Sequence, residues 1–419
     1  MLRVKGTQDF LNLTLFNFII DKINKHLALY AFSPIKIPIL EHTQLFKRTL
    51  GQYTDVVSKE MFIIQSHHGS TSPEDSICLR PEITAPTVRA FIDNAIQETP
   101  WKVYTIGECF RYERPQKGRF REFNQVSIEV IGSASVSQDV QMIKMLDRLF
   151  HEAIRFNNYA LHINYIGCPA DRAAYKEKLK KFLDSNAESI CDNCKERKEK
   201  NILRVFDCKV EHDQELYRKA PHITDFLCKA CEGEWQMLQN DLELLSVTFT
   251  VQPTLVRGLD YYNKTVFEFV SGGLGAQNAF CGGGRYDQLV TQLGGKHDQP
   301  SIGAAIGVER LLLLLEPYQD TLPLAQPPAL QVVMPLDTAQ KTLALLLADE
   351  LQAQGLCAEV LLENHTLKSM MKTANRLGAS HALIIGEDEQ HSNQVTVKNM
   401  VTGQQTTIAQ AELAHYLKK

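Results

Sequence analysis

A stretch of fourteen residues, from 110 to 123, constrains the fold of this chain more than any other part of its sequence. It holds five basic side chains and two carboxylates around a turn between Pro115 and Gly118. The residues on either side of it, 103–106 and 125–131, are rich in β-branched and aromatic side chains, a composition typical of strands. The sequence therefore predicts a β-hairpin whose loop is crowded with arginine.

The charge of this loop can be interpreted in two ways. The planar guanidinium of arginine matches phosphate oxygens two at a time, so the loop can be a phosphate cradle; alternatively, it is the solvated end of an ordinary hairpin. Phe110, Phe120 and Phe123 interrupt the charged residues, and a wholly exposed loop needs no aromatics. Because these rings would anchor the loop to a core, the sequence favours the phosphate cradle.

The same stretch resembles motif 2 of the class II aminoacyl-tRNA synthetases, in the form typical of the histidyl-tRNA synthetase family, in particular its bacterial members. Residues 255–262 (Leu-Val-Arg-Gly-Leu-Asp-Tyr-Tyr) and 282–287 (Gly-Gly-Gly-Arg-Tyr-Asp) resemble the two signatures of that family, and residues 304–311 resemble class II motif 3. A helix over 13–30, a strand over 32–40 and Pro38 near its end are similar to motif 1, which builds the dimer interface in the family. An edge strand that tolerates a proline is the alternative.

Composition excludes several classes of protein. No apolar run reaches the roughly eighteen residues of a membrane span, and the polar start of the chain does not read as a secretory signal. We therefore expect a cytoplasmic protein, with no membrane contact, whose ten cysteines are reduced. The net charge of −4 argues against a generally basic nucleic-acid binder, but a local basic surface is enough to engage tRNA.

The length of 419 residues predicts two or three domains. The resemblance implies an α+β fold in which a class II antiparallel sheet flanked by helices occupies residues 1–320. A helical insertion is expected at about 171–239, a linker at 321–329 and an anticodon-binding α/β domain at 330–419. Strands and helices alternate in that last segment, which predicts a mixed sheet with mostly parallel strands, although such a module carries no function by itself.

The resemblance also implies how ATP, bound with Mg2+, would be held. Arg111 would bind the α-phosphate, Arg257 would reach it from the other side in a role often filled by a metal, and Arg310 would bind the γ-phosphate. Glu113 is a further ATP-binding residue, and Arg257 and Arg111 are the expected catalytic residues. Each buried arginine has an alternative role as a structural ion-pair partner.

The expected histidine-binding residues are Glu82, Thr84, Gln125, Glu129, Tyr261 and Tyr262. Glu82 would bind the ammonium group, and Glu129 and Tyr262 would bind the two imidazole nitrogens. Gln125, Ser127 and Glu129 alternate along one strand, so they share a face; a wet surface is the alternative to a polar pocket. Tyr261 and Tyr286 either line the pocket or are plain core aromatics. Ser127 and Asn124 depart from the family pattern, which usually has glycine and often has histidine there.

Two sets of basic residues are candidates for tRNA contacts. The resemblance assigns Arg114, Gln116, Lys117 and Arg119, at the tip of the hairpin, to the acceptor end of the tRNA. In the last segment, Lys368, Lys372 and Arg376 recur every four residues. This spacing gives one helix face that is either solvated or in contact with the anticodon stem.

The insertion contains two Cys-x-x-Cys pairs, Cys191 with Cys194 and Cys228 with Cys231. Four thiolates with this spacing can form one tetrahedral zinc site, and Cys208 is a fifth candidate ligand. The chemistry of the class requires no zinc, so incidental reduced cysteines in a helical insertion are the alternative.

The resemblance as a whole implies a homodimeric histidine–tRNA ligase with ATP, L-histidine and tRNA(His) as its partners. The alternative from another class is the non-catalytic, histidine-sensing regulatory subunit of ATP phosphoribosyltransferase. That relative generally lacks the anticodon domain and the full Arg-Gly-Leu-Asp-Tyr-Tyr signature, and this chain is expected to have both. A threonine, proline or glycine synthetase would leave residues 257–262 and 282–287 unexplained.

Overall fold

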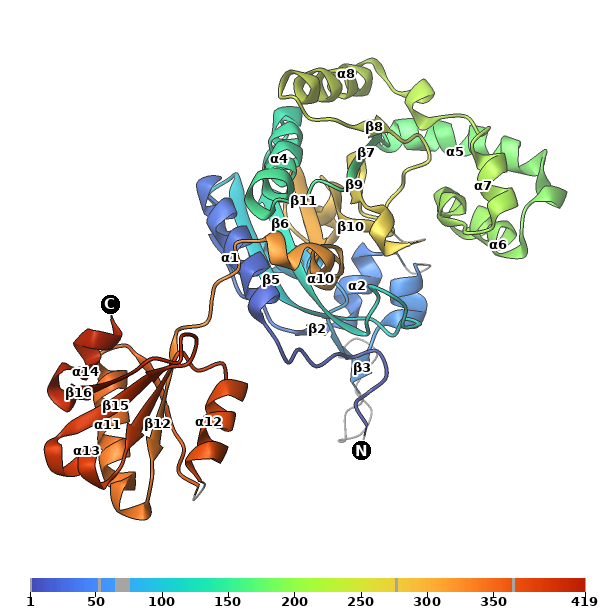
Figure 1. Cartoon of the computed structure of the whole chain (residues 1–419). Coiled ribbons are helices and arrows are strands. Elements are labelled where there is room, and N and C mark those ends of the chain that lie inside the picture. Colours follow the sequence, from blue (N-terminus) through green and yellow to red (C-terminus); the bar gives the residue numbers. More distant parts are fainter. Residues whose placement is uncertain (1, 52–53, 65–75, 276–277, 364–365, 419) are drawn as a thin grey trace. The chain divides into compact units, whose positions relative to one another are not determined.

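The computed structural model describes residues 2–51, 54–64, 76–275, 278–363 and 366–418. The chain forms two compact units, Met1–Leu324 and Ala325–Lys419 (Figure 1). Each unit has its own sheet and its own hydrophobic cores. Within the described ranges, no helix is long and apolar enough to cross a membrane.

The first unit is built on an eight-stranded sheet in the order β1-β5-β6-β11-β10-β9-β7-β8. The strands are β1 (Ser33–Pro34), β5 (Trp101–Phe110), β6 (Glu122–Ile131), β7 (Ala160–Tyr165), β8 (Thr250–Val251), β9 (Asn263–Val270), β10 (Ala279–Arg285) and β11 (Ser301–Gly307). All pairs from β5 across to β7 are antiparallel, and the two outermost pairs are parallel. The predicted hairpin is confirmed, since β5 and β6 pair from Trp101 with Ile131 to Phe110 with Glu122.

One face of this sheet is covered by helices that pack on the apolar side chains of β6. The helices are α1 (Thr14–Leu29), α4 (Val136–Arg148), α8 (Lys229–Leu244) and α10 (Val308–Leu315), and the turn η2 (Leu149–Ile154) follows α4. Val126, Ile128 and Val130 are fully buried in the same hydrophobic cluster as these helices. Since side chains alternate along a strand, Gln125, Ser127 and Glu129 lie on the opposite face, as predicted.

The segment after α1 corrects one expectation. A strand over 32–40 is wrong: β1 holds only Ser33–Pro34, and the chain then moves to a second, three-stranded sheet. Proline lacks the N–H that a ladder needs, and the carbonyls of Ile37 and Pro38 instead accept hydrogen bonds from Arg80 Nη1, at 3.1 and 3.2 Å.

The second sheet consists of β2 (Leu40–His42), β4 (Ile77–Leu79) and β3 (Ile63–Ile64). The other helices of this region are α2 (Thr43–Thr49), η1 (Val56–Glu60), α3 (Thr84–Asp93) and α9 (Leu289–Gln292).

The insertion is mainly helical, as predicted, and its helices begin at Pro169 and end at Leu244. They are α5 (Pro169–Asp184), η3 (Ala187–Ser189), α6 (Asp192–Lys200), η4 (Ile202–Asp207), α7 (Glu211–Tyr217), η5 (Ile223–Phe226) and α8. Buried side chains of α5, α6, η4 and α7 share one hydrophobic cluster with α2, α3 and residues 261–262. The insertion is therefore packed against the unit that carries it.

The second unit is a five-stranded sheet with helices on both faces. Its strands are β12 (Leu330–Pro335), β13 (Cys357–Val360), β14 (His381–Ile385), β15 (Gln394–Asn399) and β16 (Gln405–Ala409), and its helices are α11 (Lys341–Ala353), α12 (Leu367–Arg376), α13 (Glu387–Ser392) and α14 (Gln410–Leu417). Helices α11 and α14 belong to one hydrophobic cluster and α12 to another. Two pairings are parallel and two are antiparallel, so the expectation of mostly parallel strands is wrong. Helix α13 and strand β16 were not predicted from the sequence. The residues of β16 are largely polar and exposed.

Candidate active site

A cleft of about 980 Å³ opens on the face of the large sheet that carries Gln125. It is bounded by the start of α3, the β5–β6 hairpin, residues 255–262, strands β9 and β10, and α10. The predicted residues that line it are Glu82, Thr84, Arg111, Glu113, Arg119, Gln125, Arg257, Tyr261, Tyr262 and Arg310. Residues separated by more than two hundred positions in the sequence thus share one cavity.

Glu82 is buried at the start of α3. Its two carboxylate oxygens accept hydrogen bonds from the backbone N–H groups of Thr84, at 2.7 Å, and Ala85, at 2.9 Å. Burial raises the pKa of Glu82 to about 6, although these two N–H donors and the nearby Arg111 act against the rise. A carboxylate that faces a cleft while fixed on a helix N-terminus is a well-positioned receptor for an ammonium group.

Glu129, on β6, is fully buried at the centre of a hydroxyl network. One of its oxygens accepts hydrogen bonds from Thr84 Oγ1, at 2.7 Å, and Ser127 Oγ, at 2.6 Å. The other accepts from the hydroxyl of Tyr286. Burial raises the pKa of Glu129 to about 7, and the three hydroxyls limit the rise. The hydroxyl of Ser127, which departs from the family pattern, is thus hydrogen-bonded to the carboxylate.

Three tyrosines form the aromatic wall beside Glu129. The ring centroids of Tyr261 and Tyr262 lie 4.5 Å apart, and those of Tyr261 and Tyr286 lie 5.7 Å apart. All three side chains are buried. Sequence reasoning left Tyr286 open between a pocket residue and a core aromatic; its hydrogen bond to Glu129 joins it to the polar network.

The side chain of Arg257 is held by a carboxylate on strand β9, that of Glu268. Its Nη1 pairs with Glu268, and its guanidinium lies 5.6 Å from the centroid of the Tyr262 ring. Burial alone would lower the pKa of Arg257, but the charge of Glu268 more than offsets this and raises it. A Cβ added at Gly282 would lie 2.5 Å from Nη1 of Arg257, so the glycine-rich β10 leaves the space that the guanidinium occupies.

A second close approach involves Glu129. A Cβ added at Gly303, on β11, would lie 1.7 Å from Glu129 Oε2. Sequence reasoning missed both Gly303 and Glu268, because neither lies in a segment that resembles a family motif. Strand pairing was the signal available for Gly303, which is opposite Glu129 in the β6–β11 ladder.

The base of the hairpin loop holds two arginines around one carboxylate. Glu113 lies 2.8 Å from Arg119 and 3.9 Å from Arg111. Arg111 also donates to the carbonyl of Pro81, at 2.9 Å, and its guanidinium lies 5.4 Å from the centroid of the Phe123 ring. Phe123 packs against a small hydrophobic cluster that contains Ile83 and Cys109, so it anchors the hairpin as predicted, whereas Phe110 and Phe120 belong to none of the clusters of the described residues.

Arg310 reaches the same loop from α10. Its Nε donates to the carbonyl of Gly118 at 3.0 Å, and Nη1 donates to the carbonyl of Ala279. Burial, together with the positive charges of Arg119 and Arg111, lowers the pKa of Arg310 to about 10. Because three guanidinium groups repel one another here and Glu113 offsets only part of their charge, this end of the cleft favours an anion.

Three of the four residues predicted to contact tRNA, at the tip of the hairpin, do not line the cleft. Gln116 and Arg119 exchange backbone hydrogen bonds across the turn at Lys117 and Gly118. Arg114, Gln116 and Lys117 are exposed. Arg119 instead lines the cleft, so the structure separates it from the three other residues predicted to contact tRNA.

Arg285 has a purely internal set of partners. Its side chain is 2% exposed, and Nη2 lies 2.7 Å from a carboxylate oxygen of Asp139, which is itself fully buried. It also donates to the backbone carbonyls of Ser133 and Ser135, at 2.9 and 2.6 Å. Arg285 therefore ties β10 to the start of α4 and does not face the cleft.

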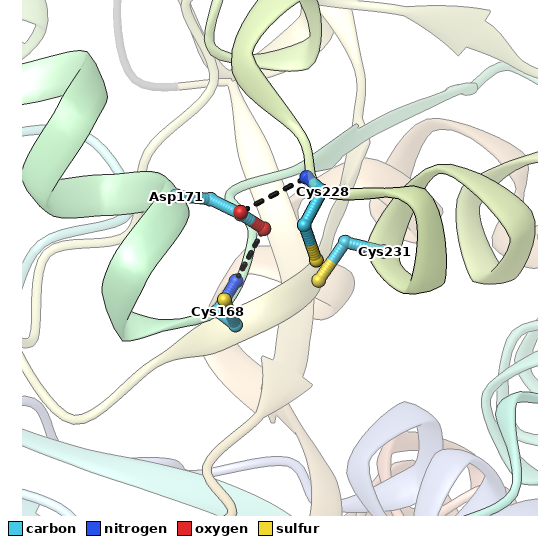
Figure 2. A group of neighbouring side chains, drawn as sticks. All are labelled: Cys168, Asp171, Cys228 and Cys231. Atoms are coloured by element: carbon cyan, nitrogen blue, oxygen red, sulfur yellow. Dashed lines mark hydrogen bonds between the residues drawn. The ribbon is translucent and has the colours of Figure 1, made fainter.

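The cysteines of the insertion form two groups and not the single four-cysteine site considered above. The α5–α8 cluster contains Cys168, Asp171, Cys228 and Cys231 (Figure 2), and the α6–α7 cluster contains Cys191, Cys194, Cys208 and Asp213. The two Cys-x-x-Cys pairs therefore lie in different clusters. Cys208 completes one of them, and Cys168, which sequence reasoning missed, completes the other.

Comparison with known proteins identifies close relatives over the whole chain. The family model for histidyl-tRNA synthetase matches residues 19–311, and the model for an anticodon binding domain matches residues 331–419. The histidine–tRNA ligase of Caldanaerobacter subterraneus subsp. tengcongensis is 40% identical over 418 residues, which cover 99% of this chain and 98% of the relative. That of Thermosipho melanesiensis is 41% identical over 411 residues, covering 97% and 96%. The crystal structure of apo S. aureus histidyl-tRNA synthetase matches with a TM-score of 0.81 and 31% identity over the full length of both chains.

Proposed function

The chain belongs to the histidyl-tRNA synthetase family and is a histidine–tRNA ligase, and we propose that the cleft on its large sheet is where histidine meets ATP. The single observation that carries this proposal is the pairing of an arginine-rich end with a carboxylate-and-tyrosine end in one cavity. The first suits a polyphosphate and the second an amino acid. The unit Met1–Leu324 would then be the catalytic part of the chain, and Ala325–Lys419 the anticodon-binding part.

The reaction at this site is a displacement at the α-phosphorus of ATP. A carboxylate oxygen of histidine forms a bond to that phosphorus while the bond to pyrophosphate breaks, which gives histidyl-adenylate. Alignment of the two ligands and neutralisation of spreading negative charge are the main contributions a protein can make. Arg111 and Arg257 would hold the α-phosphate from two sides, and Arg310 would hold the γ-phosphate; their positions around one cavity support these roles.

ATP is generally used by class II synthetases together with Mg2+, and the cleft contains suitable ligands. Glu113 and Glu268 both line it, and carboxylate oxygens are the donors that Mg2+ prefers. We propose that these two residues help to hold the ion that accompanies ATP. The ion would supply further positive charge beside the phosphates.

The polar network at the other end of the cleft supports the proposed histidine site. Glu82, fixed on the N-terminus of α3, would bind the ammonium group. Thr84, Gln125 and Tyr261 would complete the wall of this site. Glu129 would accept a hydrogen bond from one imidazole N–H, and Tyr262 would contact the other imidazole nitrogen. Glu129 is fully buried and is not among the residues that line the cleft, but it accepts hydrogen bonds from three hydroxyls, so the imidazole would meet a carboxylate whose position is fixed.

Replacing Glu129 with glutamine is expected to raise the KM for histidine about ten- to a hundredfold, because one hydrogen bond to a charged group is lost. In the wild type, KM should rise as pH falls through about 7, where Glu129 takes up a proton. Histidine itself titrates near pH 6.5, so the informative quantity is the difference between the two enzymes between about pH 5.5 and 8.5. A pH profile that the substitution leaves unchanged would contradict this role.

The same substitution is expected to stabilise the protein without its ligands. A carboxyl group whose folded-state pKa is raised contributes its stability below its unfolded pKa and loses it as pH rises through the folded value, here from about 4.5 to about 7. At alkaline pH the neutral Glu129→Gln variant should therefore unfold with a free energy higher by up to about 3 kcal/mol. Chemical denaturation of both proteins at acidic and alkaline pH measures this difference.

The tRNA would meet both units. We propose that Arg114, Gln116 and Lys117, exposed at the hairpin tip, contact the acceptor end, together with Arg119 at the border of the cleft. In the second unit Lys368, Lys372 and Arg376 are exposed on α12, which is compatible with either a solvated face or an anticodon-stem contact. We further propose that the enzyme is a homodimer and that it works in the cytoplasm. Helix α1 and the short strand β1 after it keep part of the resemblance to motif 1, and this part supports the homodimer.

The function is tested by ATP–pyrophosphate exchange with each of the twenty amino acids, followed by charging of tRNA(His). Exchange is expected with histidine alone. Lys117→Ala is expected to raise the KM for tRNA in the charging step and to leave the exchange rate unchanged, because the exposed side chain of Lys117 is not among those that line the cleft. Histidine binding without any exchange would instead indicate the regulatory subunit of ATP phosphoribosyltransferase, which would overturn the proposal.

A further inference from the structure

The two cysteine clusters of the insertion share a construction that neither sequence motif predicts. In the α5–α8 cluster, Cys168 and Cys228 are the residues that cap the N-termini of α5 and α8, and Asp171 and Cys231 lie three positions further on. A residue at the cap and one three positions later point toward the same space at the end of a helix. Figure 2 shows the four side chains converging from these two helix ends.

The α6–α7 cluster repeats this construction with one helix and a turn. Cys191 caps α6 and Cys194 lies three positions later, while Cys208 follows η4 and Asp213 lies in the first turn of α7. Three of the four residues are buried. Each cluster thus combines three thiols and one carboxylate from segments that are separate in the sequence.

The distances fit a tetrahedral metal ion better than they fit a disulfide. In each cluster the four ligand atoms lie within 4.8 Å of one another, and the sulfurs of Cys191 and Cys208 are 3.8 Å apart. Two thiolates bound to zinc at about 2.3 Å in tetrahedral geometry are about 3.8 Å apart, whereas a disulfide bond is about 2.05 Å. Cys208 Sγ and Asp213 Oδ2 are 3.3 Å apart, close to the roughly 3.6 Å that the same geometry gives for sulfur and oxygen.

The carboxylates are held in place without using all of their lone pairs. Asp171 accepts backbone N–H groups of Cys168, at 3.1 Å, and Cys228, at 3.0 Å, one on each oxygen. Each carboxylate oxygen has two lone pairs, so one remains on each for a metal ion. Hydrogen bonds that orient a ligating carboxylate are a usual feature of metal sites.

The surroundings of the two clusters can also stabilise the negative charge of a zinc site of this kind. A zinc ion with three thiolates and one carboxylate leaves an excess of negative charge, which the N-termini of helices stabilise. The N-termini of α5 and α8 meet at the α5–α8 cluster, and the N-terminus of α6 lies at the α6–α7 cluster. Binding would displace the three thiol protons of each cluster into solvent, while the carboxylate is already ionised.

We propose that the insertion binds two structural zinc ions, one in the α5–α8 cluster and one in the α6–α7 cluster, each through three cysteines and one aspartate. The first site joins the two ends of the insertion, since Cys168 precedes its first long helix and Cys231 opens its last. The second site fixes η4, and Arg204 on η4 pairs with Asp260 of the cleft-lining segment at 2.8 Å. Arg204 itself lines the cleft, with Asn193 and Lys209 of the same insertion, so zinc would maintain this wall of the cleft.

The proposal is tested by the metal content of the full-length protein, purified without chelators and measured by plasma mass spectrometry for zinc and iron. The wild type is expected to hold about two zinc ions per chain. Cys231→Ser and Cys194→Ser should each hold about one, and the double variant close to none. Cys357→Ser, on β13 of the other unit and in neither cluster, is the matched control and should retain both.

A measurement on the wild type covers the case in which these variants fail to fold. Titration with an organomercurial, which takes up one thiol at a time, should release one zinc ion for about every three cluster thiols blocked, detected with a chromogenic chelator. The same titration of Cys357→Ser corrects for the partly buried thiol that lies outside both clusters. Asp171→Asn and Asp213→Asn should each lower zinc affinity at one site. Wild-type protein with negligible zinc, with iron in its place or with cysteines paired as disulfides would overturn the proposal; unchanged zinc affinity in both asparagine variants would overturn the aspartate ligands.

Discussion

The Arg257→Ala variant is expected to lose about a hundred- to a thousandfold in the rate of histidine-dependent ATP–pyrophosphate exchange. A buried donor aimed at charge that develops in the transition state contributes about this much in other enzymes. Arg257 lines the cleft and is paired with Glu268 alone among the described carboxylates within ion-pair distance. Its removal would also leave Glu268 without its ion-pair partner, so the ion proposed to accompany ATP would alone offset the negative charge of that carboxylate.

Two further variants show whether the loss comes from the guanidinium itself. Arg257→Lys keeps the charge but not the planar fork, so its rate should lie between those of the wild type and the alanine variant. Arg148→Ala removes an arginine from α4 whose side chain is 49% exposed and pairs with Glu152, and its rate should equal that of the wild type. Equal activity in Arg257→Ala and wild type would exclude Arg257 from the reaction.

The Arg285→Met variant is expected to unfold with a free energy lower by about 3–5 kcal/mol, the usual cost of removing one partner from a buried ion pair. Asp139, which is fully buried, would lose its ion-pair partner at 2.7 Å, and the carbonyls of Ser133 and Ser135 would lose their donor. Denaturant unfolding followed by circular dichroism measures the change. Although Arg285 lies in a segment that resembles a family signature, its expected effect is on stability.

The double variant Arg285→Met/Asp139→Leu separates the pair from general damage to the core. If the cost arises from an unpaired buried charge, removing Asp139 as well should restore a large part of the lost stability, because buried ion pairs are often replaceable by apolar side chains. A double variant that is less stable than Arg285→Met would show that packing around the arginine, and not the isolated charge, sets the cost.

Local patterns in the sequence were sufficient for the elements that bury one continuous face. The helical spacing of apolar residues predicted α1, and alternation along β6 predicted which of its side chains lie on the face opposite the helices. The strand expected over 32–40 failed because its carbonyls are satisfied by Arg80, more than forty positions away. Strand β16 was missed for a related reason: its polar residues pair with β15 and bury little apolar surface.

The candidate site followed from linear motifs, and what they could not supply were partners from other strands. Glu268 is opposite Gly282 in the β9–β10 ladder and beside Arg257, a placement that depends on register. Gly303 reaches Glu129 in the same way. The cysteines show most clearly what linear motifs could not supply. The two Cys-x-x-Cys pairs suggested a single four-cysteine site, but each pair belongs to a different cluster.

The regular ladder between β5 and β6 has a consequence for how this protein can change during evolution. Ten consecutive residue pairs keep a constant register from Trp101 to Phe110, and one added residue within β6 would turn every side chain beyond it to the opposite face. Such an insertion would drive Glu129 into the apolar cluster and Ile128 into the cleft. We therefore expect changes in length to be confined to the loop between the strands, where variation would alter the proposed tRNA contacts at the tip and leave the facing of the β6 side chains unchanged.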